Sequence, residues 1–132
     1  MATRAQAREA VVTLLYAKDI GNENIEVFLD EILEDTKIRN RQKEFALSLY
    51  NGVKLNMDMI DPEINKYLKE WELEKIGNVE RSILRLGAYE ILYSDLDGAI
   101  VINEAVEIAK NLAGESAPKL INGVLDSIKK NK

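Results

Sequence analysis

Apolar residues recur at spacings of three and four along almost the whole chain, and no stretch alternates regularly between apolar and polar positions. The first pattern is that of one face of an α-helix, whereas the second would indicate a strand. In the first half of the chain the pattern predicts three helices, the first of which ends before Gly21. Their apolar stripes are Ala7, Ala10, Val11, Leu14 and Leu15; Val27, Phe28, Ile32 and Leu33; and Phe45, Ala46, Leu49, Val53 and Leu55.

Pro62 allows two interpretations of the element that follows. Asp61 fits an N-cap with proline at the first helical position, which would begin a new helix there. If the element is instead continuous from Asn56, Pro62 would kink it, because proline lacks the N–H that continues the hydrogen-bond ladder. Residues 71–76, beginning at Trp71, are expected to form a short turn that ends at Gly77.

Residues 78–92 are apolar on nearly every side, which predicts a helix in the middle of the fold. Asn78 is expected to cap this helix. Glycine costs a helix about 1 kcal/mol relative to alanine, so Gly87 is expected to permit the close approach of another helix. Residues 95–98 form the next break.

Two further helices complete the chain. The first ends near Gly114, and the second is expected to be capped by Ser116, with Pro118 tolerated in its first turn. The pattern therefore predicts an all-α protein with about seven helices, in a single domain spanning residues 1–132.

The composition lacks the side chains that many catalytic mechanisms need. The 132 residues include neither cysteine nor histidine. This excludes disulfides, a thiolate nucleophile, a Cys/His zinc site and an imidazole base. Neither a Gly-rich phosphate loop nor a GxSxG elbow is present. We therefore expect no enzymatic reaction, no cofactor and no metal.

The chain shows no sign of a membrane segment. No apolar run approaches the roughly 20 residues that span a bilayer. Arg4 and Arg8 interrupt the N-terminal segment, which lacks the apolar block of a signal peptide. We expect a cytoplasmic protein without membrane contact.

Charge is distributed unevenly, although the net charge is only −5. Residues 23–35 carry six acids and no base, and four bases follow at Lys37, Arg39, Arg41 and Lys43. The C-terminal segment is also rich in lysine. Local basic clusters on an acidic protein can hold nucleic acid, although such charge runs usually form only solvated helix faces.

Four segments together resemble the NusB family. They read RAQAREAVVTLLY at 4–16, VERSILRLGAYE at 79–90, VINEAVEIAK at 101–110 and KLINGVLD at 119–126. They occur in the family's order and spacing, and with the helices between them they cover essentially the whole chain. The resemblance implies an all-α fold of two packed helical subdomains. It also implies a transcription antitermination factor that binds boxA-type single-stranded RNA together with the ribosomal protein NusE, within the RNA polymerase antitermination complex.

The resemblance points to an RNA-binding N-terminal segment. Arg4 and Arg8 lie one helical turn apart, so two guanidiniums at that spacing can clamp successive phosphates. The alternative is a solvated helix end. Family members often carry more arginines in this segment, whereas Ala5 and Gln6 lie between the arginines here. Fewer phosphate contacts predict a low affinity for RNA in the absence of a partner.

The start of the last helix is a second candidate RNA contact. Ser116, Lys119 and Asn122 lie where backbone N–H groups and the helix dipole favour a phosphate. Plain capping by Ser116 and a solvated Lys119 are the alternatives. Leu120 stands where the family commonly has an aromatic residue, and leucine cannot stack on a base as a ring does.

Several charged residues have other expected roles. The resemblance places Glu80, and less directly Glu74, at the NusE contact, although Glu80 would equally stabilise its own helix dipole. Arg85, Glu90 and Glu104 lie within apolar helices, so we expect an internal ion-pair network rather than a catalytic carboxylate pair. Asn103 and Asn122 are expected to join that network by satisfying backbone groups. Tyr16 and Tyr89 are expected in the core.

Two alternatives to the adaptor function remain open. A NusB-like domain also begins certain ribosomal RNA cytosine methyltransferases, so the chain would then be a detached piece of such an enzyme. The other alternative is a structural helical protein that forms a homodimer through an apolar patch.

Overall fold

The computed structural model describes residues 2–68 and 73–132, and within those ranges it contains helices and no strands. The elements are α1 (Arg4–Asp19), η1 (Glu23–Phe28), α2 (Leu29–Asp35), α3 (Arg41–Asn65), η2 (Leu73–Lys75), α4 (Asn78–Tyr93), α5 (Gly98–Leu112) and α6 (Ala117–Lys130). The all-α prediction is confirmed. The expected count of about seven is slightly high for the α-helices, because residues 23–28 and 73–75 form short 3₁₀ helices.

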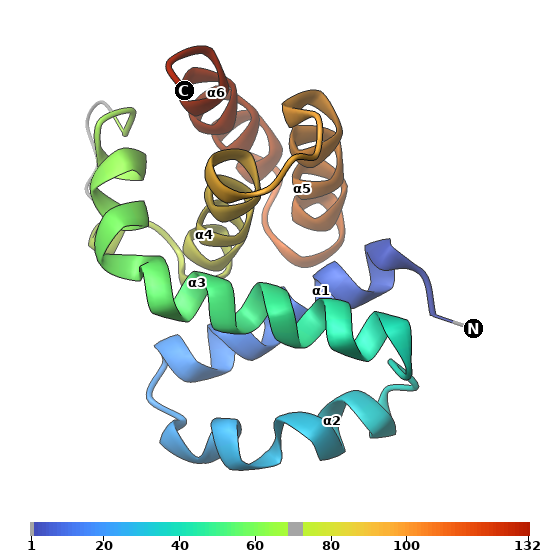
Figure 1. Cartoon of the computed structure of the whole chain (residues 1–132). Coiled ribbons are helices and arrows are strands. Elements are labelled where there is room, and N and C mark those ends of the chain that lie inside the picture. Colours follow the sequence, from blue (N-terminus) through green and yellow to red (C-terminus); the bar gives the residue numbers. More distant parts are fainter. Residues whose placement is uncertain (1, 69–72) are drawn as a thin grey trace.

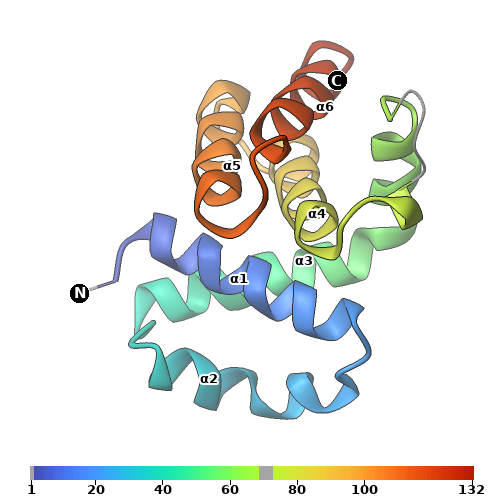
Figure 2. The same cartoon turned by 180° about the vertical axis from the view of Figure 1, so that it is seen from behind.

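The helices form two packed groups (Figure 1). One group contains α1, α2 and α3, and the other contains α4, α5 and α6. Helix α4 packs against α1 and α3 of the first group and against α5 and α6 of its own group, and the reverse view shows α1 crossing the base of the second group (Figure 2). The central position predicted for residues 78–92 is therefore confirmed.

Helix α3 is continuous through Pro62, so the interpretation of Asp61 as an N-cap is wrong. The continuous alternative holds, although the helix begins at Arg41 rather than Asn56. Figure 1 shows it bending in its second half. Ile60 and Ile64, on either side of the proline, are fully buried. Their packing offsets the one backbone hydrogen bond that proline removes. Trp71, the start of the predicted turn, lies outside the described residues.

Of the two predicted helix caps, the one at Asn78 is wrong, and the one at Ser116 is right in position but lacks the side-chain hydrogen bond. Asn78 is the first residue of α4, and the N-cap is Gly77. Ser116 occupies the N-cap of α6, but its side chain makes no capping hydrogen bond. Its backbone is helical (φ −85°, ψ −12°) rather than extended, so the hydroxyl does not point back to the first-turn amides. Pro118 lies in the first turn of α6, as predicted.

Part of the predicted core is exposed. Val27 and Leu55 are 76% and 79% exposed, and Phe28 is 45% exposed. Val27 and Phe28 lie in η1, a 3₁₀ helix, to which the 3.6-residue spacing used for the predicted stripe does not apply. Leu55 lies two residues after Val53, so it projects from nearly the opposite side of α3, and its place in the predicted stripe was wrong. The central positions, including Leu33, Leu84 and Leu125, are fully buried.

Gly87 lies where α6 approaches α4, as predicted. A Cβ at this position would lie 2.6 Å from Cδ1 of Leu125, which is itself fully buried. We expect Gly87→Ala to lower the free energy of unfolding by about 1–2 kcal/mol, because overpacking exceeds the gain in helix propensity. Urea denaturation followed by circular dichroism measures this change.

Gly123→Ala is the matched control for Gly87→Ala. Gly123 also lies within a helix, but nothing approaches within 4 Å of a Cβ built there. Only helix propensity changes at that position, so Gly123→Ala should raise the free energy of unfolding by up to about 1 kcal/mol. Equal effects of the two substitutions would contradict the close-packing explanation.

Candidate nucleic-acid interface

A capping box positions Arg4 at the beginning of α1. The Thr3 hydroxyl accepts a hydrogen bond from the Gln6 amide at 3.1 Å, and the Thr3 amide donates to the Gln6 side chain at 2.9 Å. Arg4 follows in the first turn and is exposed. Its guanidinium carbon lies 4.5 Å from the centroid of the Phe45 ring. The cation is therefore held against α3 while its outer face remains open to solvent.

Arg8 occupies a different environment from the one predicted. Its side chain is buried, and it donates to both carboxylate oxygens of Glu90 at 2.8 and 2.9 Å. Its guanidinium carbon also lies 5.1 Å from the Phe45 centroid. The prediction that Arg4 and Arg8 form two equivalent phosphate clamps must be corrected. Arg4 faces solvent, and Arg8 joins α1 to α4.

A basic loop lies beside the N-terminus of α1. Lys37, Arg39 and Arg41 line a hollow of about 790 Å³ together with Ala2. Lys37 and Asn40 adopt positive φ angles of 63° and 57°, which turn the chain sharply between α2 and α3. The sequence signal for this loop was the run of bases after the acidic segment, but its position beside Ala2 is a tertiary property.

The basic side chains of this loop differ in whether they already pair with an acidic residue. Arg39 pairs with Glu34 at 3.1 Å, and Lys43 contacts the same carboxylate at 3.2 Å. The hydrogen bond to Glu34 is the main reason that the pKa of Lys43 is raised. Burial lowers this pKa, and the negative charge of Asp30 raises it further. Lys37 and Arg41 make no ion pair with any residue in 2–68 or 73–132. Arg4, Lys37 and Arg41 are therefore the bases near the start of α1 that have no ion pair with a described residue, and we refer to them as the open cationic cluster.

The predicted residues of α6 lie along a groove between α5 and α6. Lys119 and Asn122 are exposed and line this hollow of about 530 Å³ with Lys129 and Asp126. Ser116 is exposed at the preceding turn, and Leu120 is half-buried. The groove offers cations and amide groups, but Asp126 reduces its attraction for phosphate.

The whole chain is similar to known proteins. A family model described as the NusB family matches residues 5–130.

This chain belongs to the NusB family.

A curated protein from Sulfurimonas denitrificans, named transcription antitermination protein NusB, is 60% identical over 132 residues, covering 100% of both chains. A structure of NusB from T. maritima has a TM-score of 0.88 and 38% identity, covering 98% of this chain and 92% of that one. A structure of the antitermination factors NusB and NusE in complex with dsRNA has a TM-score of 0.86 and 33% identity, covering 98% of this chain and 97% of that one.

In this NusB-family chain Arg85 and Glu90 each form an ion pair, but with other residues rather than with each other. Arg85 donates to both oxygens of Asp61 at 2.9 Å each and to Asp19 at 3.2 Å. Burial opposes its charge, but the hydrogen bonds and charges of Asp61 and Asp19 outweigh burial and raise the pKa of Arg85. The expected ion-pair network is therefore confirmed for Arg85 and Glu90, which use separate partners.

Arg81 extends this network to the segment before α4. It donates to Asp19 at 2.8 Å and to the backbone carbonyls of Leu73, Glu74 and Ile76. One guanidinium thus binds two carbonyls of η2 and one carbonyl just after it, and it pairs with the end of α1.

Other members predicted for the network do not join it. Glu104 is half-buried and lies with Arg8 around a cavity of about 10 Å³, but it has no ion pair within the described part of the chain. Asn103 and Asn122 are exposed and satisfy no backbone group there. Both expectations were wrong for the same reason, since helical spacing does not show which neighbour faces a side chain.

The predicted partner residues lie at the N-terminal end of α4. Glu74 is exposed, and Glu80 is half-buried with its carboxylate folded over Gly77. Neither side chain is engaged in an ion pair with a described residue. Both acids are therefore available to a basic partner, and their role stays a prediction.

None of the helices that the structure describes is both long and apolar enough to cross a membrane. Among the same residues, no cluster of three or more carboxylates is arranged to hold a metal ion.

Proposed function

We propose that this chain is a transcription antitermination factor that binds boxA-type single-stranded RNA together with NusE, as part of the RNA polymerase antitermination complex. It performs no chemical reaction and acts in the cytoplasm on nascent RNA. The supporting observation is the full-length match to relatives named transcription antitermination protein NusB, including one covered completely. A stand-alone relative of equal length favours this function over a detached methyltransferase domain.

The open cationic cluster supplies the phosphate contacts in this proposal. Lys37 and Arg41 line a hollow with Ala2, two residues before α1, and Arg4 is the first residue of α1, so a single strand that follows the start of α1 can contact all three bases. Arg8 acts indirectly, because its pair with Glu90 fixes α1 against α4. Lys119 and Asn122, with Ser116 at the preceding turn, would extend the contact along α6.

Glu80 and Glu74 form the proposed contact with NusE. Carboxylates that face a basic ribosomal protein would steer its approach and fix its orientation. Glu74 lies in η2 and Glu80 in the first turn of α4, whereas Arg4 contacts the ring of Phe45 in α3. The two partners therefore have separate surfaces.

Removing Arg4 tests the RNA assignment. We expect Arg4→Ala to weaken binding of a fluorescent boxA-like single-stranded RNA about tenfold, since charge-assisted hydrogen bonds contribute about 1.5–3 kcal/mol each. The slope of log affinity against log salt should fall by about 0.7 for each lost phosphate contact. Polarisation across a salt series, with and without NusE, measures both quantities.

Lys66→Ala is the matched control. Lys66 is an exposed lysine at the opposite end of α3, where it pairs with Glu63, so its loss should leave affinity and salt slope unchanged. Equal effects of Arg4→Ala and Lys66→Ala would contradict the cluster. The absence of binding by the unmodified protein under every condition would overturn the proposed function.

A further inference from the structure

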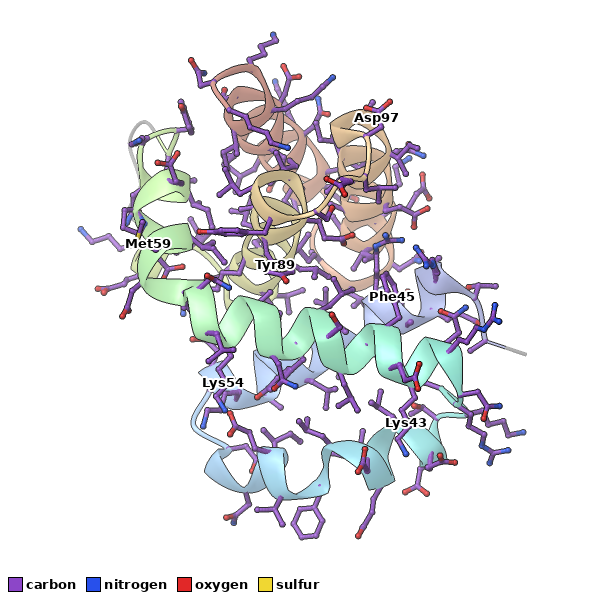
Figure 3. All side chains as sticks on the ribbon, in the orientation of Figure 1. Lys43, Phe45, Lys54, Met59, Tyr89 and Asp97 are labelled. Atoms are coloured by element: carbon purple, nitrogen blue, oxygen red, sulfur yellow. The ribbon has the colours of Figure 1, made fainter. Side chains whose placement is uncertain are left out.

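A second hollow adjoins Arg4 and is not used by the phosphate contacts proposed above. It has a volume of about 520 Å³ and lies between α3 and the C-terminal end of α4. Its aromatic lining is Phe45, Tyr89 and Tyr93. Figure 3 shows Phe45 and Tyr89 on the side of α3 that faces the second helical group. The hollow therefore combines aromatic rings with a cation at its edge.

The two tyrosines form a stacked pair with one open member. Their ring centroids are 5.5 Å apart with an interplanar angle of 30°. Tyr89 is fixed from behind by Gly52, where a Cβ would lie only 2.2 Å from the tyrosine ring. Tyr93 is 47% exposed. A rigid inner ring thus supports an outer ring that is available for stacking.

The polar groups around these rings suit a base better than a phosphate. The Ser94 hydroxyl is already engaged, since it donates to the Glu90 carbonyl at 2.7 Å and accepts from the Leu96 amide at 3.2 Å. Asp95 is exposed at the same edge and carries a negative charge. A carboxylate repels phosphate but accepts hydrogen bonds from the amino groups of a nucleobase. Arg4, on the other side, can hold the adjoining phosphate.

We propose that this hollow is a subsite for one unpaired RNA base, which stacks on Tyr93 while Arg4 contacts the neighbouring phosphate and Asp95 accepts from the base edge. Single-stranded RNA is commonly bound in this way, through aromatic stacking beside cations that follow the backbone. The inference rests on the proposed function, because that function supplies the RNA.

Substitutions at Tyr93 test the stacking contact. Loss of a base-stacking ring is expected to weaken RNA binding about 5- to 150-fold. We therefore expect Tyr93→Ala to lose at least fivefold in affinity for a boxA-like single strand in the presence of NusE, and Tyr93→Phe to stay within twofold. Phe28→Ala is the control, because Phe28 is a similarly exposed ring, 45% accessible, on η1.

A set of RNAs with a single abasic nucleotide at each position separates stacking from a structural effect. One abasic position should weaken binding to the unmodified protein, and the same position should give no further loss with Tyr93→Ala. Losses that are identical for both proteins at every position, or full affinity of Tyr93→Ala, would overturn the subsite. If Arg4→Ala loses affinity while Tyr93→Ala does not, the subsite fails and the proposed function stands. If the unmodified protein binds no RNA, both fail.

Discussion

Glu90→Leu is expected to lower the free energy of unfolding by about 3–5 kcal/mol, because it leaves the charge of Arg8 buried without its partner. The two side chains are only 6% and 4% exposed. They form a bidentate pair across 82 positions of sequence. Leucine fills most of the volume, so the loss reflects the uncompensated charge. In a chain of 132 residues the melting temperature should fall by roughly 10–20 °C.

The double substitution Arg8→Met with Glu90→Leu is the control for this effect. Replacing both members of a buried ion pair by apolar residues is often close to neutral. We therefore expect the double variant to recover most of the stability that Glu90→Leu loses, as measured by urea denaturation and thermal melting. A double variant as unstable as Glu90→Leu would show that packing at Glu90, rather than charge pairing, sets the stability.

The second large effect is expected at Arg85. Arg85→Ala should cost about 2–3 kcal/mol, less than a fully buried pair, because its side chain is 12% exposed and its partners are more so. The substitution removes the bidentate contact with Asp61 in α3 and the contact with Asp19 in α1. Urea denaturation measures the change in stability.

Two variants sharpen this test. Lys66→Ala removes an exposed ion pair, which solvent screens, so it should leave the free energy of unfolding almost unchanged. Arg85→Lys retains the charge but cannot donate to both oxygens of Asp61 in the planar geometry of a guanidinium, so we expect an intermediate loss. Full stability of Arg85→Lys would mean that charge alone, without the bidentate geometry, holds the helices together.

The sequence predicted the helices well where packing agrees with local periodicity. The stripe of α1 and the nearly all-round apolar surface of α4 both faced the core. Gly87 was correctly interpreted as a close approach because the propensity cost of a mid-helix glycine is explained only by a neighbour. The continuity of α3 through Pro62 depended instead on burial of Ile60 and Ile64, which no local rule includes.

The candidate site was predicted less completely. The family resemblance directed attention to the N-terminal arginines, and Arg4 lies in an open cationic cluster. Helical spacing made Arg4 and Arg8 appear equivalent, although only Arg8 turns inward to Glu90. Lys37 and Arg41 were visible as bases, but their position beside Ala2, just before α1, depends on how the chain turns from α2 to α3.

The sequence by itself determined the all-α class, the central position of α4 and, through its resemblance, membership of the NusB family, because these follow from periodicity and from motifs along the chain. The tertiary structure alone decided which charges pair, which apolar residues stay exposed and which bases share a surface. Those outcomes depend on contacts between residues far apart in sequence, such as Arg8 with Glu90 and Asp19 with Arg85. A one-dimensional pattern shows which residues must find partners, and only the packed helices show where the partners lie.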